Sequence, residues 1–167
     1  MKNLSLFSLL IFAGLITSCG ENSQPCYPID GNRIHIQVLD REGKDLLDQT
    51  QEGVYQSNNI KIYYERNGKL EEFYDGGLSN MRRNFRIDPP DVGEDYYGMN
   101  VILDAEKTVI QWNNIEADTL LAKIVGSGNP DFCPTRFVQE IYHQGDLKWD
   151  GSTFKTGMGF TIIKQRQ

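Results

Sequence analysis

The segment of residues 60–74 has the sequence IKIYYERNGKLEEFY. Its two halves are rich in β-branched and aromatic residues, and they flank a central Asn-Gly pair. Asn-Gly is the preferred pair in two-residue type I′ turns, whose backbone twist matches that of two antiparallel strands. The segment therefore predicts a β-hairpin.

The turn also fixes the register of this hairpin, because pairing Arg66 with Lys69 determines every other pair. Ile62 and Tyr64 then lie on one face, which is expected to pack into the core. The opposite face is polar and includes two tyrosines in diagonal contact. Its residues are Lys61, Tyr63, Glu65, Glu72 and Tyr74.

Seven further segments have the alternation or the apolar content of strands, and turn residues separate them. These segments are residues 34–38, 84–87, 100–104, 107–112, 120–125, 137–142 and 153–164. No segment shows the apolar period of a helix. The pattern predicts a mostly-β fold: an antiparallel β-sandwich, immunoglobulin-like or transthyretin-like, with a small β-barrel as the alternative.

The first 18 residues have the features of a signal peptide. Lys2 provides a positive charge, and the apolar run of residues 4–16 is shorter than the roughly 20 residues that a membrane-spanning helix needs. The run ends in Ile16-Thr17-Ser18-Cys19, an aliphatic residue and two small residues before a cysteine. This motif resembles the lipobox of bacterial lipoproteins.

The resemblance implies cleavage before Cys19 and attachment of acyl chains such as palmitate to that cysteine. Two or more acyl chains anchor a protein stably to a membrane. The residue after Cys19 is glycine and not aspartate, which by the enteric sorting rule implies the outer membrane, with either the periplasmic leaflet or the cell surface open. Residues 19–32 are expected to form a tether and residues 33–167 a single domain.

Composition limits the partners of this 167-residue chain. Its formal net charge of −6 and the lack of any Lys/Arg run argue against nucleic acid or an anionic lipid surface as the main partner. The one basic doublet, Arg82-Arg83, is expected at a solvated strand end. No cofactor is expected.

Two cysteines remain if Cys19 carries lipid. Disulfides persist in secreted proteins, and two cysteines allow one pairing, so a Cys26–Cys133 bridge is expected. Two buried free thiols are the alternative. Ser127 lies in Gly-Ser-Gly, but its flanks lack the outer glycines of a nucleophile elbow, which argues against serine catalysis.

Four acidic residues are candidates for a metal site. Asp88, Asp91, Glu94 and Asp95 lie in a short stretch with two prolines and a glycine, and hard cations prefer several oxygen ligands. The alternative is that these carboxylates are solvated, as is usual for acidic side chains in loops.

Four tyrosines are candidates for ligand binding, because tyrosine offers a rigid ring with a polar tip. These are Tyr63 and Tyr74 on the polar hairpin face, together with Tyr96 and Tyr97. They could form a stacking platform for a sugar or a peptide. In the alternative, Tyr63 and Tyr74 are an ordinary stabilising pair between strands.

The domain weakly resembles small surface lipoproteins that have β-sandwich domains and no assigned activity. The segment of residues 112–119 is similar in style to a strand–turn–strand connection in those proteins. We expect a non-catalytic binding or structural module, lipid-anchored at the outer membrane or cell surface, with a glycan or protein ligand. The alternative is an envelope hydrolase whose active site is built from loops.

Overall fold

The structure is a computed structural model that describes residues 31–126, 136–152 and 158–165. The lipobox, most of the tether, Ser127 and the predicted Cys26–Cys133 bridge lie outside these residues. The regular structure of the described part consists of strands alone. They are β1 (Arg33–Asp40), β2 (Lys61–Arg66), β3 (Lys69–Glu72), β4 (Phe85–Asp88), β5 (Gly98–Ile102), β6 (Lys107–Gln111), β7 (Ala117–Gly126), β8 (Arg136–His143), β9 (Asp146–Asp150) and β10 (Gly159–Lys164).

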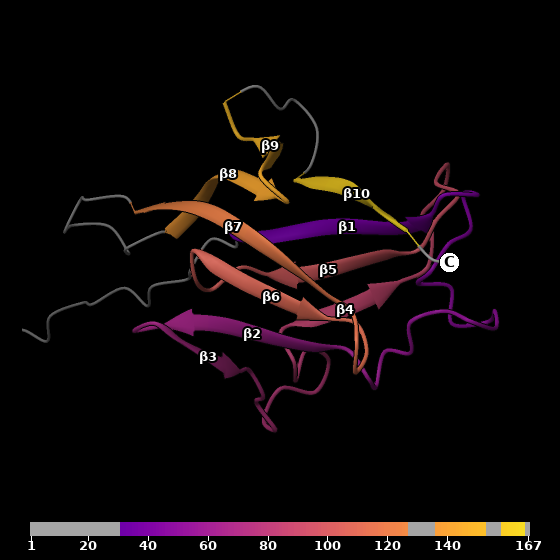
Figure 1. The fold of residues 1–167 in the computed structure, drawn as a ribbon, viewed down its shortest axis with the longest axis horizontal. Helices are drawn as coiled ribbons and strands as arrows, with labels where there is room; N and C mark the ends of the chain where they lie inside the picture. The colour runs from indigo at the N-terminus through magenta and orange to yellow at the C-terminus, as the bar shows by residue number, and fades with distance from the viewer. Residues whose placement is uncertain (1–30, 127–135, 153–157, 166–167) are drawn as a thin grey trace, which may run out of the picture.

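The strands form two sheets, one of four strands in the order β10-β1-β5-β4 and one of six in the order β3-β2-β6-β7-β8-β9 (Figure 1). The prediction of a mostly-β, sandwich-like fold is confirmed, and the sheets do not close into a barrel. One detail is wrong: β1 pairs with β10 in parallel, so the smaller sheet is mixed and not antiparallel throughout.

The predicted hairpin consists of β2 and β3. Arg66 pairs with Lys69, as expected, and Asn67 and Gly68 have φ angles of 52° and 74°. Positive φ at both central residues defines a type I′ turn, so the Asn-Gly pair sets this register. Tyr64 is 1% exposed and therefore faces the core, as predicted.

The core lies between the two sheets, where alternate side chains of each strand point inward. In β1 these are Ile34, Ile36 and Val38, all fully buried. The pair Leu46 and Leu47 folds back beneath β1 and is also fully buried, and the Leu46 amide donates to the carbonyl oxygen of Val38 at 2.8 Å.

Strand β9 is absent from the sequence-based prediction. Its sequence, DLKWD, has an acidic residue at each end and one buried apolar side chain, Trp149. It pairs with β8 through a tight turn at Gln144 and Gly145, which have φ angles of 53° and 86°. Gln-Gly is not among the usual residue pairs of two-residue hairpin turns, so the sequence did not indicate a hairpin at this position.

The described residues contain no helix that is long and apolar enough to cross a lipid bilayer.

Candidate functional site

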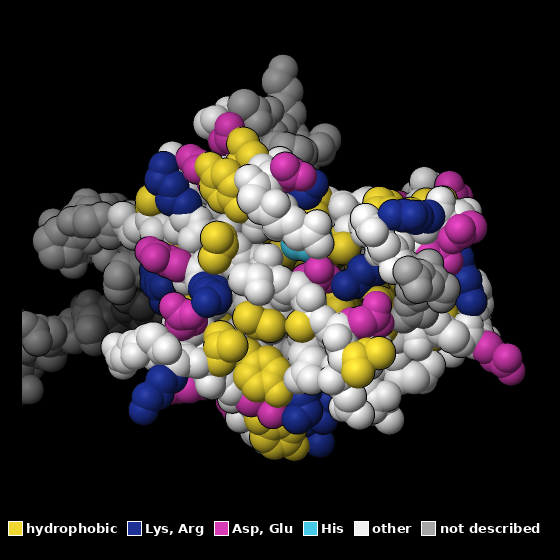
Figure 2. All heavy atoms as spheres, in the orientation of Figure 1, with side chains coloured by type: hydrophobic (Ala, Val, Ile, Leu, Met, Phe, Trp, Pro, Cys, Tyr) yellow, Lys and Arg dark blue, Asp and Glu magenta, His cyan; other side chains and the backbone are white. Residues whose placement is uncertain are grey.

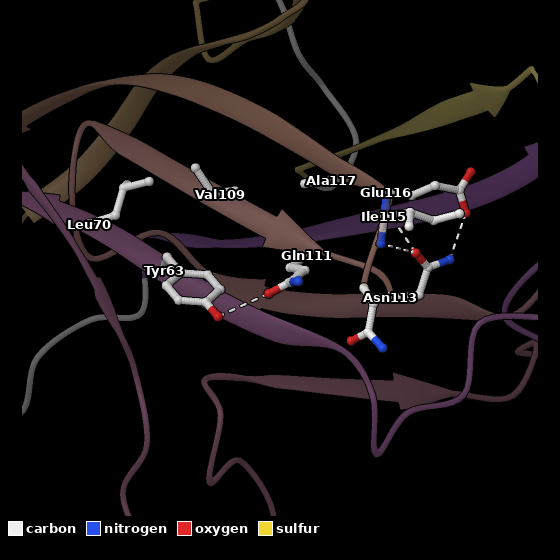
Figure 3. A pocket seen from close by; sticks show the side chains of 9 residues that line it. Tyr63, Leu70, Val109, Gln111, Asn113, Ile115, Glu116 and Ala117 are labelled. Atoms are coloured by element: carbon white, nitrogen blue, oxygen red, sulfur yellow. Dashed lines mark hydrogen bonds between the residues drawn. The ribbon is translucent and has the colours of Figure 1, made fainter.

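A groove of about 340 Å³ lies on the outer face of the six-stranded sheet (Figure 3). It spans β2, β3 and β6 and ends at the turn between β6 and β7. We call it the Tyr63 groove. Its lining residues are Tyr63, Leu70, Val109, Gln111, Asn113, Asn114, Ile115, Glu116 and Ala117.

Strand alternation directs Tyr63 into this groove. Its neighbours Ile62 and Tyr64 are buried, so the side chain between them points to the outer face. The Tyr63 hydroxyl donates to Oε1 of Gln111 at 2.9 Å, and Tyr63 pairs with Val109 on β6. The ring is therefore held in place along the floor of the groove (Figure 3).

A tight turn forms the far wall of the groove. The Trp112 amide donates to the carbonyl oxygen of Glu116 at 2.9 Å, and Oδ1 of Asn113 accepts from the amides of Ile115 and Glu116. Nδ2 of Asn113 also donates to Glu116 Oε2 at 2.7 Å. This network fixes the turn while Ile115 remains 91% exposed. The prediction of a strand–turn–strand connection over residues 112–119 is confirmed.

The charged side chains around the groove are largely paired with one another. Lys61 bonds to Glu72 at 3.0 Å, and Lys107 bonds to Glu65 at 2.5 Å. Figure 2 shows hydrophobic patches separated by charged side chains on this side of the molecule. The groove thus combines an apolar floor with a few polar groups, the composition that is common in small-molecule sites.

A second cluster, absent from the sequence-based candidates, is buried at one end of the sandwich. Asp118 on β7 accepts hydrogen bonds from Lys164 at 2.6 Å and from Trp112 at 2.5 Å, and its other oxygen lies 2.9 Å from His143 Nε2. Because Lys164 is on β10, the cluster joins the six-stranded sheet to the four-stranded one. We call it the Asp118 cluster.

The Asp118 cluster keeps its carboxylate ionised. Burial raises the pKa of Asp118, but the hydrogen bonds from Lys164, His143 and Trp112 outweigh burial and leave the pKa below its usual value. The Lys164 ammonium also lies 5.4 Å from the Trp112 ring centroid and 5.8 Å from that of Tyr55. Cation–π attraction therefore adds to the ion pair.

The Asp118 cluster borders a pocket of about 480 Å³, which Gln144, Gln165 and the 115–117 turn also line. The alternation of side chains along a strand gave a sequence signal for this cluster. Asp118 lies two residues before Leu120 and Lys164 two residues after Ile162, so each charged side chain points to the same, inward face as that apolar neighbour. This alternation predicts that both charged side chains are buried. Their pairing with each other depends on how the two sheets pack, and a local sequence pattern does not show that.

The four candidate tyrosines do not share one pocket. Tyr63 lines the Tyr63 groove, whereas Tyr74 is 61% exposed and lines a different pocket near Arg82. Tyr97 packs against the core, and Tyr96 beside it is half-buried. Of the predicted platform, Tyr63 alone lies in the groove.

The side chains of the four candidate metal ligands do not form one cluster. Asp88 bonds to Arg86 at 2.6 Å and accepts from Asn100 at 2.7 Å. Asp91, Glu94 and Asp95 are exposed. Within the described ranges, no three His, Cys, Asp or Glu side chains come together as a metal-binding group.

Comparisons with protein-family models, with curated protein sequences and with solved structures gave no match. Function is therefore inferred from the residues of this chain.

Proposed function

We propose that this chain is a non-catalytic glycan-binding module, lipid-anchored at a bacterial outer membrane, whose ligand lies in the Tyr63 groove. One observation supports the binding role above all others. The Tyr63 ring lies along the floor of a groove that also has the polar side chains of Gln111, Asn114 and Glu116, and a hydrogen-bonded turn forms the far wall of this groove.

A sugar matches this combination of surfaces. A pyranose ring has an apolar face of C–H groups and an edge of hydroxyls, so it needs a flat apolar partner and neighbouring hydrogen-bond groups. The tyrosine ring supplies the rigid surface, and the amides of Gln111 and Asn114 supply donors and acceptors. The volume of about 340 Å³ lies within the usual range for small-ligand sites, roughly 300–1,000 Å³.

The lining residues favour binding over hydrolysis. Glycosidases mostly use two carboxyl groups that flank the bond to be cut. The nine residues that line the groove include one carboxylate, that of Glu116, and it accepts a hydrogen bond from Asn113. An envelope hydrolase, the alternative activity, would need a second acidic group at this site.

The test of binding is a glycan array probed with the full-length protein and with two tyrosine variants. Tyr63→Ala removes the ring from the groove and is expected to weaken binding at least tenfold. Tyr142→Ala is the matched control, because Tyr142 is a half-buried residue on the same sheet that bonds to Glu140 and does not line the groove. Equal losses in both variants, or no glycan bound by the wild type, would overturn the proposal.

The anchor is tested separately, because it rests on the lipobox at Cys19. Intact mass spectrometry of protein from membranes of the native host should give the mass for cleavage before Cys19 plus acyl chains. A mass for unmodified protein, cleaved elsewhere or not at all, would contradict the membrane assignment and leave the binding proposal to stand on the array.

A further inference from the structure

A second pocket, of about 370 Å³, has a composition unlike that of the Tyr63 groove. It lies between the segment before β2 and the segment that joins β3 to β4. We call it the arginine pocket, and the residues that matter to its chemistry are Ser57, Tyr74, Ser79, Asn80, Arg82 and Arg83. No acidic residue is among those that line it.

The two arginines differ from three of the other arginines in the described part of the chain. Arg66, Arg86 and Arg136 each form a salt bridge to an aspartate. Neither Arg82 nor Arg83 has such a bridge within residues 31–126, 136–152 and 158–165. In a chain with net charge −6, two arginines that line the same pocket without carboxylate partners among the described residues are a local excess of positive charge.

Backbone contacts hold Arg83 in place without neutralising it. Its Nη1 donates to the carbonyl oxygens of Asn58 and Ile60 at 2.6 and 2.9 Å. These bonds tie the β3–β4 segment to the segment before β2, and they leave the positive charge and the other N–H groups available. Arg83 is therefore preorganised, which reduces the entropy lost when a ligand binds.

Arg82 is exposed and more lightly held. Its Nε lies 3.3 Å from the carbonyl oxygen of Leu78, and its own carbonyl oxygen accepts from the Asp75 amide at 2.8 Å. Within the described residues, neither terminal nitrogen of its guanidinium group has a hydrogen-bond acceptor.

We propose that the arginine pocket binds a phosphate or sulfate group. A tetrahedral oxyanion accepts several hydrogen bonds at once, and guanidinium groups match its geometry in pairs of parallel bonds. The hydroxyl groups of Ser57, Ser79 and Tyr74 and the amide of Asn80 supply neutral donors around the two charges. This site is separate from the Tyr63 groove and does not depend on the glycan proposal.

The test is a titration of the full-length protein in detergent with inorganic phosphate and, separately, with sulfate, at constant ionic strength. The arginine Nε–H signals in NMR spectra are the readout. The expected result is saturable binding that perturbs the Arg82 and Arg83 signals, and that becomes at least fivefold weaker in Arg82→Ala. Binding that does not saturate, or that perturbs all arginines alike, would overturn the proposal.

Two control variants distinguish binding in the arginine pocket from nonspecific charge attraction and from binding in the Tyr63 groove. Arg86→Ala removes an exposed arginine outside the pocket and should change the affinity less than twofold; an equal loss in both arginine variants would show nonspecific charge and contradict the site. Tyr63→Ala should leave phosphate binding unchanged, whatever it does to glycans. Titration with a sulfated disaccharide and its unsulfated form then shows whether the anion is bound alone or as part of a saccharide.

Discussion

Tyr63 and Tyr64 are neighbours in sequence, but they point to opposite faces of the six-stranded sheet. The Tyr64 hydroxyl donates to the carbonyl oxygen of Ile102 at 2.6 Å and accepts from Asn84 at 2.8 Å, and burial raises the pKa of this phenol far above its usual value. Among the described residues, the hydroxyl of the half-buried Tyr63 has one hydrogen bond, to Gln111. The same residue type thus stabilises the fold on one face and is available to a ligand on the other.

Charged groups show the same division. The Asp118 cluster is buried between the sheets, and its Asp118 carboxylate is paired with the Lys164 ammonium at 2.6 Å. The arginine pocket is open, and its two charges have no partner among the described carboxylates. Paired internal charges therefore support the structure, whereas unpaired external ones are free to bind, and the following variants test that distinction.

The largest effect is expected for Asp118→Ala. It leaves the Lys164 ammonium buried without its counter-ion, so the free energy of unfolding should fall by about 3–5 kcal/mol. Urea denaturation measures this loss. The control is Asp146→Ala, since Asp146 pairs with Lys148 at a side-chain exposure of 75% and should contribute less than about 1 kcal/mol. Similar losses in the two variants would remove the contrast between buried and exposed pairs.

The next largest effect is expected for Tyr64→Phe. Loss of the hydroxyl leaves Asn84 and the carbonyl oxygen of Ile102 without their buried partner, which should cost about 1–3 kcal/mol. Tyr63→Phe is the matched change on the outer face and should cost less than about 0.5 kcal/mol, because water can replace the lost bond to Gln111. Thermal or urea unfolding measures both variants, and equal losses of unfolding free energy in Tyr64→Phe and Tyr63→Phe would contradict the difference between the two faces.

A smaller effect is expected from acid. Because the pKa of Asp118 is lowered in the folded protein, the stability it contributes is present above the unfolded pKa of about 3.9 and is lost as pH falls through the folded pKa. The stability gap between wild type and Asp118→Asn should therefore be wide at pH 6, and it should narrow as the pH falls below the unfolded pKa towards the lower folded pKa. Urea midpoints measured from pH 6 to pH 2 give the gap, and a constant gap would contradict an ionised Asp118.

The sequence predicts the β2–β3 hairpin fully because its information is local. Asn67 and Gly68 both tolerate positive φ, and that requirement alone sets the register. The parallel pairing of β1 with β10 was not predicted, because the two strands are more than 100 residues apart in the sequence and no local pattern links them. Gly159 permits this pairing, because a Cβ at that position would lie 2.7 Å from the His35 carbonyl oxygen.

The sites were less predictable than the strands. Tyr63 was a candidate because alternation places it on a polar face, and the structure puts it in a groove. Tyr74 was assigned to the same platform, but β3 ends at Glu72, so Tyr74 departs from the sheet and lines the arginine pocket. The Arg82-Arg83 doublet looked like a solvated strand end, because no local pattern shows that Arg83 bonds to carbonyl groups more than 20 residues away.

The central claim is that the outer face of the six-stranded sheet binds the ligand, and NMR mapping tests it most directly. The full-length protein, isotopically labelled, is titrated with the strongest glycan from the array. We predict that the largest shifts occur at Tyr63, Gln111 and residues 113–117, with the Asp118 cluster unchanged. Largest shifts at Asp118, His143 and Lys164, with Tyr63 unaffected, would place the ligand in the end pocket and contradict the account.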